Sequence, residues 1–413
     1  MTKPAAFAIT GMGAVTPAGV GIERLQAALE RPRSCTRRID RFETADLPSD
    51  LGAVADDFDP RDHLERNEIE WLDRSAQLLV AAGDMALAQS GTLLDGVDRE
   101  RIGIFEASSV GGIEAALQAQ ASFADRGYKA LGLRTLSRSM SGAGGAMLSV
   151  RHGIQGPCLA LSCGSVSSAA VLSVALDQLA AGTIDVALVA ASEAPVTRSV
   201  LALFGRARAL ARRCDDPARA CRPFDASRDG FVLGEGAAAL IIERAADARQ
   251  PLALVAGVAM TGDASCLFAP ADDGVQQARA IGLAMQRAAV TARDVDYVSA
   301  HGTGTRLNDR IETRALKMAL GDDARRIPVS SSKSMFGHCL GACSAVEIVK
   351  TVLCMRRGII PATLNLEHPD PECDLDYVPG HPRPAAIDVA LVNNSSFGGR
   401  NVCTVLRAAH HCT

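Results

Sequence analysis

The chain has 413 residues, more than a single hydrophobic core usually encloses, so two domains or two fused halves are expected. Hydrophobic residues make up 48% and charged residues 22%, and the formal net charge of -4 excludes the global basic field of a nucleic-acid-binding protein. The N-terminus has no secretory signal pattern and no apolar run reaches the roughly 18 residues that span a bilayer, so we expect a cytoplasmic protein without membrane contact.

Short apolar segments alternate with amphipathic stretches along the chain. In chain order, the expected strands are RIGIFEA, CLALS, DVALVAA, DYVSAH and DVALVNN. Each is apolar on both faces, as buried strands of a layered sheet should be. Helical periodicity predicts helices over residues 73–89, 166–181 and 274–289. The alternation predicts an α/β fold in which helices cover sheets.

Three pairs of similar segments recur in the same order in the two parts of the chain. The pairs are IDVALV at residues 184–189 and 387–392, FAITGMGAV at 7–15 with LVAGVAMTG at 254–262, and the turn, strand and glycine-rich loop at 90–112 and 288–305. Three pairs in one order predict two similar halves. The charged, proline-containing segment ADARQPL separates them, so the expected halves are residues 1–250 and 251–413.

The segment LALSCGSVSSA, residues 159–169, leads from a strand through a turn into a helix. It carries Cys163 and, two residues later, Ser165 at the predicted helix N-terminus, where free N–H groups favour a developing anion. The local sequence alone favours a structural interpretation, in which Ser165 is only the N-cap of the helix. Cys163 likewise fits a buried thiol of the strand.

Two later segments add titratable side chains. SAHGTGTRLND places His301 at a strand end before hydroxyls and glycines, and SSSKSMFGHCLGACSAVE adds Lys333, His338 and Glu347. A buried Lys333 needs a partner, and Glu347 is available. Taken alone, each histidine is more often a structural residue than a catalyst. No phosphate-binding loop, complete dinucleotide fingerprint or GxSxG elbow occurs. The twelve cysteines show no metal-binding spacing, so no metal is expected.

Seven segments, in order and over nearly the full chain, resemble motifs of the elongating β-ketoacyl-acyl-carrier-protein synthases of the thiolase superfamily. They are ITGMGAVTPAG, RIGIFEASSVGG, GPCLALSCGS, RPFDASRDGFVLGEG, HGTGTRLND, SSSKSMFGHCLGA and NNSSFGGRN. The resemblance implies a thiolase-like five-layer α-β-α-β-α sandwich of two duplicated halves. It also implies a homodimer, or a heterodimer with a related ketosynthase.

The implied reaction is decarboxylative condensation of malonyl-carrier protein with an acyl chain in fatty-acid or polyketide biosynthesis. The expected partner is an acyl carrier protein, whose phosphopantetheine carries the substrate, so no resident cofactor is expected. The resemblance gives catalytic roles to His301, His338, Lys333 and Glu347, and substrate-binding roles to Thr303, Thr305, Phe397 and Gly398. Phe397 matches a gating residue whose N–H helps to form the oxyanion hole.

The family's nucleophilic cysteine is missing from its position. Counting from the GP pair at residues 156–157, or back from Gly182, places Ser165 there, with Cys163 two residues early as an alternative nucleophile. A serine at a helix N-terminus is not ionised as a thiol is and needs a base, either His301 or His338. Slow or altered turnover is therefore expected.

Three hypotheses follow from this departure. Ser165 is acylated; or the chain is a malonyl decarboxylase or a non-condensing, chain-length-factor-like subunit that works with a Cys-bearing ketosynthase; or Cys163 reaches the site. Retention of both histidines and Lys333 favours an acyltransferase, and an engineered serine is equally compatible with the sequence.

Further departures surround the expected gate. Arg306, Ser396 and Arg400 stand where relatives commonly carry Pro, Gly and Thr. A basic segment could meet an acidic carrier protein or simply be a solvated face; its arginines are Arg206, Arg208, Arg212 and Arg213.

Overall fold

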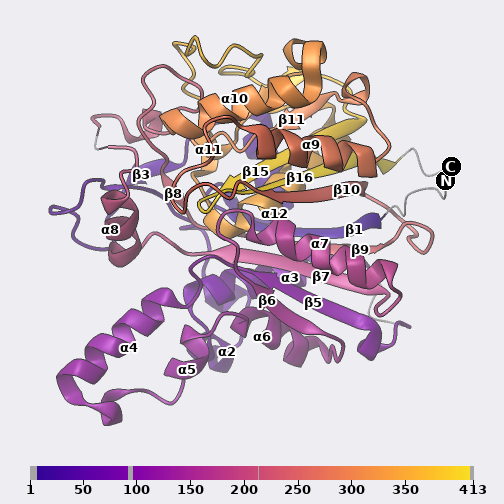
Figure 1. Cartoon of the computed structure of the whole chain (residues 1–413). Coiled ribbons are helices and arrows are strands. Elements are labelled where there is room, and N and C mark those ends of the chain that lie inside the picture. Colours follow the sequence, from indigo (N-terminus) through magenta and orange to yellow (C-terminus); the bar gives the residue numbers. More distant parts are fainter. Residues whose placement is uncertain (1–6, 92–95, 213, 410–413) are drawn as a thin grey trace.

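The computed structural model describes residues 7–91, 96–212 and 214–409 and contains a main sheet of 11 strands (Figure 1). Strand pairing divides this sheet into two halves of identical pattern. The N-terminal half has the order β6-β5-β7-β9-β1, and the C-terminal half has the order β12-β11-β15-β16-β10. In each half the first three strands pair in parallel. The fourth strand pairs antiparallel with both the third and the fifth. This repeated topology confirms the predicted duplication.

The strands of the two halves have the following bounds. They are β1 (Phe7–Thr16), β5 (Ile102–Ala107), β6 (Cys158–Leu161), β7 (Val186–Glu193), β9 (Gly236–Arg244), β10 (Ala253–Gly262), β11 (Tyr297–Ser299), β12 (Val329–Ser330), β15 (Val389–Ser396) and β16 (Arg400–Ala408). Strands β1 and β10 pair antiparallel, which joins the halves. The similar sequence segments lie on equivalent strand pairs: β1 with β10, β5 with β11, and β7 with β15.

Short strands lie outside these two sets. They are β2 (Gly19–Val20), β3 (Thr36–Arg38), β4 (Leu51–Ala53), β8 (Leu233–Gly234), β13 (Ile359–Ile360) and β14 (Arg383–Pro384). The α-helices are α1 (Ile22–Glu30), α2 (Arg66–Trp71), α3 (Arg74–Gln89), α4 (Ile113–Arg126), α5 (Thr135–Ser139), α6 (Ala143–His152), α7 (Ser167–Ala180), α8 (Arg198–Arg206), α9 (Val275–Arg287), α10 (Arg306–Leu320), α11 (Lys333–Phe336) and α12 (Cys343–Arg357).

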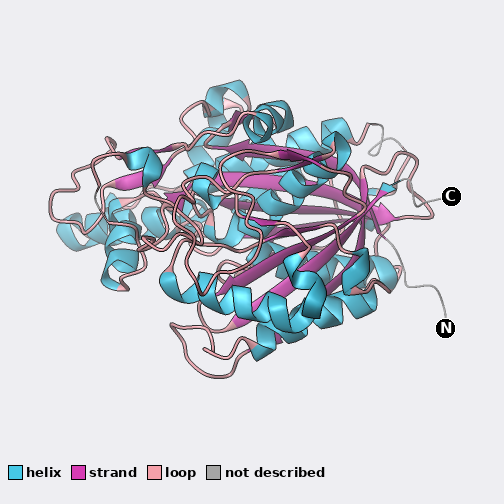
Figure 2. Cartoon of the chain, turned by 90° about the horizontal axis from the view of Figure 1, so that it is seen from above, coloured by secondary structure: helices cyan, strands magenta, loops and turns pink. Residues whose placement is uncertain are grey.

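Helices cover both outer faces of the halves and fill the space between them (Figure 2). Apolar residues of α3 and α6 pack on the outer face of the N-terminal half. Helices α7 and α12 pack together in the central core, between inward side chains of both halves. Helices α9 and α10 cover the outer face of the C-terminal half. The predicted five-layer α-β-α-β-α sandwich is therefore confirmed.

Strand β6 differs from the sequence prediction. It was expected to be buried, but it lies at the sheet edge, and its residues are alternately exposed and half-buried. An apolar sequence cannot distinguish a strand buried within its own chain from one left at an edge of that chain. Among the described residues, no helix is both long and apolar enough to cross a membrane.

Candidate active site

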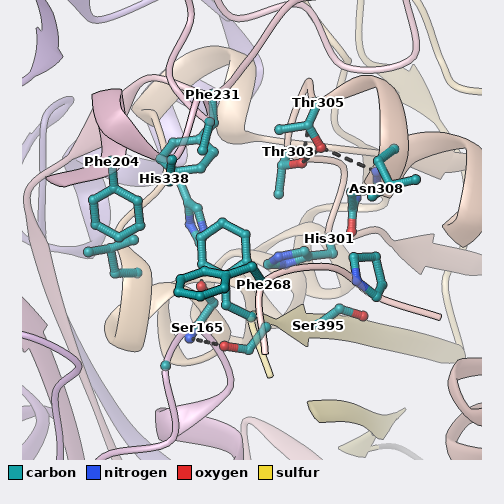
Figure 3. A pocket seen from close by; sticks show the side chains of 18 of the residues that line it. Ser165, Phe204, Phe231, Phe268, His301, Thr303, Thr305, Asn308, His338 and Ser395 are labelled. Atoms are coloured by element: carbon teal, nitrogen blue, oxygen red, sulfur yellow. Dashed lines mark hydrogen bonds between the residues drawn. The ribbon is translucent and has the colours of Figure 1, made fainter. Parts of the chain in front are cut away.

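The loops that follow β6, β11, β12 and β15 meet at one cavity with a volume of about 330 Å³ (Figure 3). Both halves of the chain contribute to it. Six of the predicted site residues line it: Ser165, His301, Thr303, Thr305, His338 and Phe397. Lys333 and Glu347 lie buried behind the lining, and Gly398 adjoins Phe397.

Ser165 lies at the turn between β6 and α7. Gly164 precedes it with a φ of +65°, a left-handed conformation that glycine adopts without strain. Helix α7 begins one residue later than expected, so its N-cap is Val166, and the predicted alternative of Ser165 as a cap is wrong. The Ser165 hydroxyl instead lies 3.0 Å from Nε2 of His338. Its side chain thus meets a potential base at the floor of the cavity.

The imidazoles of His301 and His338 face this space from two different loops (Figure 3). Their ring centroids are 5.3 Å apart and the rings are nearly perpendicular. Burial, followed by the positive charge of Lys333, holds the pKa of each histidine well below its ordinary range. Both are therefore neutral near pH 7, and a neutral imidazole can accept a proton from a hydroxyl.

A buried carboxylate that the sequence analysis missed holds the His301 loop. The backbone N–H groups of His301 and Gly302 each donate to Glu312 at 2.7 Å, and Asn393 Nδ2 donates to it at 2.6 Å. Burial raises the Glu312 pKa to about 6 despite these bonds. The sequence signal was a carboxylate in the helix directly after the HGTGT loop. Glu312 is a positioning residue, since it touches the loop backbone.

The threonines of the same loop also line the cavity. The hydroxyls of Thr303 and Thr305 lie 3.0 Å apart, and Thr305 Oγ1 also accepts from the N–H of Asn308, which caps helix α10. Thr303 Oγ1 in turn accepts from the N–H of Thr305, so each hydroxyl oxygen holds one backbone N–H of the loop and faces the cavity.

Lys333 meets its predicted partner, but a second lysine lies closer. Lys333 Nζ is 3.5 Å from Glu347, whereas Lys350 Nζ is 2.5 Å from the other carboxylate oxygen. Although burial alone would raise it, the charges of Lys350 and Lys333 lower the Glu347 pKa to about 2. The carboxylate also accepts from the hydroxyls of Ser299 and Ser332. Lys350 could not be identified from the sequence, because a lysine within a helix usually faces solvent.

Replacing Glu347 with glutamine should destabilise the fold by about 3–5 kcal/mol, because it leaves two buried ammonium groups without a counter-charge. Urea unfolding would measure this loss. Glu372→Gln is the matched control, since Glu372 forms an exposed ion pair with Arg310 and its loss should cost at most about 1 kcal/mol. Equal stability of the two variants would contradict a buried charge network.

No cysteine is among the described residues that line the cavity. Cys163 packs against the central core, and its backbone N–H donates to Ser167 Oγ. Cys343 Sγ lies 3.2 Å from the carbonyl oxygen of Ser165, but it is buried, and burial raises its pKa to about 11. This arrangement favours Ser165 over Cys163 as the nucleophile.

Two of the three remaining departures, Ser396 and Arg400, line the cavity beside Phe397, whereas Arg306 lies outside the lining and its Nε donates to the carbonyl oxygen of Arg228. Phe397 is 40% exposed and stacks on Phe204, with ring centroids 6.2 Å apart. Arg208 and Arg400 line the cavity, and the described lining contains no carboxylate. The mouth is therefore electropositive. Of the other arginines noted in the sequence, Arg206 and Arg212 lie outside the lining and Arg213 lies outside the described residues.

The chain matches two family descriptions. Residues 6–248 match "Beta-ketoacyl synthase, N-terminal domain" and residues 252–367 match "Beta-ketoacyl synthase, C-terminal domain". It is 37% identical over 400 residues to a 3-oxoacyl-[acyl-carrier-protein] synthase 2 of Synechocystis, covering 95% of this chain and 96% of that protein. It is 37% identical to the tetracenomycin ketoacyl synthase alpha subunit of Streptomyces glaucescens, covering 96% of each.

Solved structures show the same similarity. One chain in the structure of a type II polyketide acyl-carrier protein in complex with its ketosynthase matches this chain with a TM-score of 0.90 at 26% identity. The match covers 98% of this chain and 100% of that chain. The ishigamide ketosynthase/chain length factor matches with a TM-score of 0.89 at 29% identity, covering 98% of this chain and 99% of that chain.

Proposed function

Because this chain belongs to the β-ketoacyl synthase family, we propose that its cavity moves an acyl group from a carrier-protein thioester to Ser165 and then condenses it with a malonyl-derived carbanion. The observation that carries the proposal is the contact of 3.0 Å between Ser165 Oγ and His338 Nε2 inside the cavity. A nucleophile and a base within hydrogen-bond reach are the minimum requirement for covalent acyl transfer.

In the first half-reaction, Ser165 Oγ attacks the thioester carbonyl while His338 Nε2 takes the hydroxyl proton. The carbon–sulfur bond breaks, the imidazolium returns the proton to the leaving phosphopantetheine sulfur, and an oxygen ester remains on Ser165. The N-terminus of α7 offers backbone N–H groups to the oxyanion that forms. No resident cofactor takes part, because the phosphopantetheine arrives on the carrier protein.

In the second half-reaction, His301 and Thr303 contact the malonyl thioester. As the malonyl carboxylate leaves as CO2, the electron pair moves to the α-carbon, and His301 stabilises the enolate oxygen. The carbanion then attacks the carbonyl carbon of the Ser165 ester and its carbon–oxygen bond breaks. The released serine oxygen takes up a proton that comes from solvent through His338. Burial, followed by the positive charge of Lys333, lowers the pKa of both histidines and keeps them neutral between steps. An oxygen ester is a poorer acceptor than a thioester, so this step is slow.

The alternative is a malonyl decarboxylase or a non-condensing subunit that works with a Cys-bearing ketosynthase. Release of CO2 from malonyl-carrier protein, with and without an acyl donor, tests the proposal. We expect release with the wild-type protein, loss in His301→Ala, and a β-ketoacyl product only when the donor is present. Release of CO2 without acylation or condensation would favour the decarboxylase, and no release at all would favour the non-condensing subunit.

An acidic carrier protein fits the electropositive mouth. Arg208 lines the cavity next to helix α8, where the phosphate of phosphopantetheine would enter. We expect Arg208→Glu to raise the half-saturating concentration of acyl-carrier protein about tenfold, with a weaker effect at high salt. Steady-state kinetics would measure it, with Arg249→Glu, in the segment between β9 and β10, as the matched control. Equal effects of the two changes would contradict docking at Arg208.

The exposed edge strand β6 suits pairing with a second ketosynthase-like chain, either identical or related. Helix α4, in the segment that connects β5 to β6, buries none of its residues within this chain. Exposed apolar side chains continue along this region: Leu117, Phe123, Tyr128, Leu131, Leu133, Leu136 and Met140. A group of exposed apolar side chains in one segment is typical of a surface that another chain covers.

Light scattering of the purified chain should therefore report a dimer, and Leu136→Asp should dissociate it. Met318→Asp, an equally apolar exposed position on α10, is the control and should leave the dimer intact. A monomer that pairs only with a Cys-bearing relative would establish a heterodimer. A monomer that pairs with neither would contradict the assignment of this surface.

A further inference from the structure

The backbone N–H of Ser165 is already engaged in this structure. It donates to the hydroxyl oxygen of Ser396, with nitrogen and oxygen 2.9 Å apart (Figure 3). Ser396 lies at the end of β15, in the other half of the chain, and lines the cavity. An amide at a helix N-terminus beside the nucleophile is where an oxyanion would be stabilised, so a protein hydroxyl occupies that position.

Gly164 makes this contact possible. A β-carbon at position 164 would lie 2.1 Å from Ser396 Oγ, closer than any such contact allows. Any side chain on residue 164 would therefore displace the hydroxyl or shift the strand end. The glycine at 164 and the hydroxymethyl group at 396 fit each other across the two halves.

The hydroxyl of the neighbouring Ser395 makes different hydrogen bonds and does not contact the Ser165 amide. Ser395 Oγ accepts from Gln277 Nε2 at 2.9 Å and donates to Asn401 Oδ1 at 3.0 Å. These two bonds are buried and hold the strand end in place. Ser396 is only half-buried and adjoins the exposed Phe397, so its side chain has room to move.

We propose that the Ser396 hydroxyl is an internal ligand of the Ser165 amide, which closes the oxyanion site at rest and must leave before Ser165 is acylated. The inference rests on the proposed acyl transfer to Ser165. An amide that donates to Ser396 cannot also donate fully to a substrate oxyanion. Loss of that hydrogen bond is therefore a cost of every acylation, and Ser396 is a positioning residue that limits the rate.

The test compares Ser396→Gly and Ser396→Ala with the wild-type protein. The rate constant of Ser165 acylation is followed by intact mass, with acyl-carrier protein and separately with p-nitrophenyl acetate. Both variants should react about fivefold faster with either donor, the gain expected from one hydrogen bond that no longer has to break. The half-saturating concentration of acyl-carrier protein should not change, which separates this role from a loss of structure. Thr183→Ala, which removes an exposed hydroxyl from the turn after α7, should react at the wild-type rate.

Gly164→Ala provides a second, independent variant. Its methyl group should displace the Ser396 hydroxyl from the Ser165 amide. The rate constant of Ser165 acylation in the double variant Gly164→Ala/Ser396→Gly should therefore be no higher than in Ser396→Gly alone. Acylation of the wild-type protein with an unchanged or slower rate in both Ser396 variants would overturn the inference and leave the proposed function standing. Acylation of none of the proteins by either donor would overturn both.

Discussion

Replacing His338 with alanine should slow the acylation of Ser165 by about a hundred- to ten-thousand-fold, the usual contribution of a general base. A serine hydroxyl does not ionise near neutral pH, so the attack depends on a proton acceptor, and His338 Nε2 lies 3.0 Å from Ser165 Oγ. The initial rate of adduct formation, followed by intact mass, measures the effect. His152→Ala is the matched control, because His152, the last residue of α6, pairs with Asp84 of α3 and does not line the cavity. A His338→Ala rate within about threefold of the control would contradict the assigned base.

The pH dependence of the same rate adds an independent readout. A base works when deprotonated, and burial together with Lys333 holds the pKa of His338 well below 6.5. The rate should therefore stay level from pH 8 down through pH 6.5 and fall only in more acidic solution. Lys333→Met removes one cause of the lowered pKa and should move the fall toward pH 6.5. A half-maximal rate at pH 6.5 in the wild-type protein would indicate an unperturbed histidine.

Replacing Ser165 with cysteine should raise the rate of condensation by at least about tenfold, because a thiol at a helix N-terminus forms a thiolate without a base. The resulting thioester is also the better acceptor for the carbanion in the second half-reaction. Formation of the β-ketoacyl product from acyl- and malonyl-carrier protein measures the change. His338→Ala should slow acylation less in the cysteine background than in the serine one, since the thiolate needs no base.

The cysteine variant also separates the alternatives. An increase in product would mean that the rest of the cavity is built for condensation and that serine limits it. Acylated Ser165→Cys protein without any product would contradict a competent condensing site and favour the non-condensing subunit. The size-matched variant Ser165→Ala should form neither adduct nor product.

The sequence predicted the duplicated architecture well, because the segments that recur are buried strands whose apolar composition is fixed by the layers on both sides. The resemblance of HGTGTRLND and SSSKSMFGHCLGA to family motifs also implied a shared site for His301 and His338, which line one cavity after β11 and α11. Exposure of β6 could not be predicted, because that depends on which strand remains at the edge of the chain.

Two buried residues that support the cavity lining could not be predicted from the sequence. Glu312 and Lys350 lie inside helices, where charged residues usually face solvent, and only the packing shows them buried against the His301 loop and Glu347. The contact between Ser396 and the Ser165 amide joins residues 231 positions apart. Its prediction needed the relative placement of the two halves to within a hydrogen-bond length.

The most direct test of serine acylation is the intact mass of the protein after incubation with acyl-carrier protein, followed by peptide mapping across residues 158–169. We predict one acyl group per chain, carried by Ser165, and none in Ser165→Ala. An adduct on Cys163, or no adduct under conditions that acylate a Cys-bearing relative, would contradict the account.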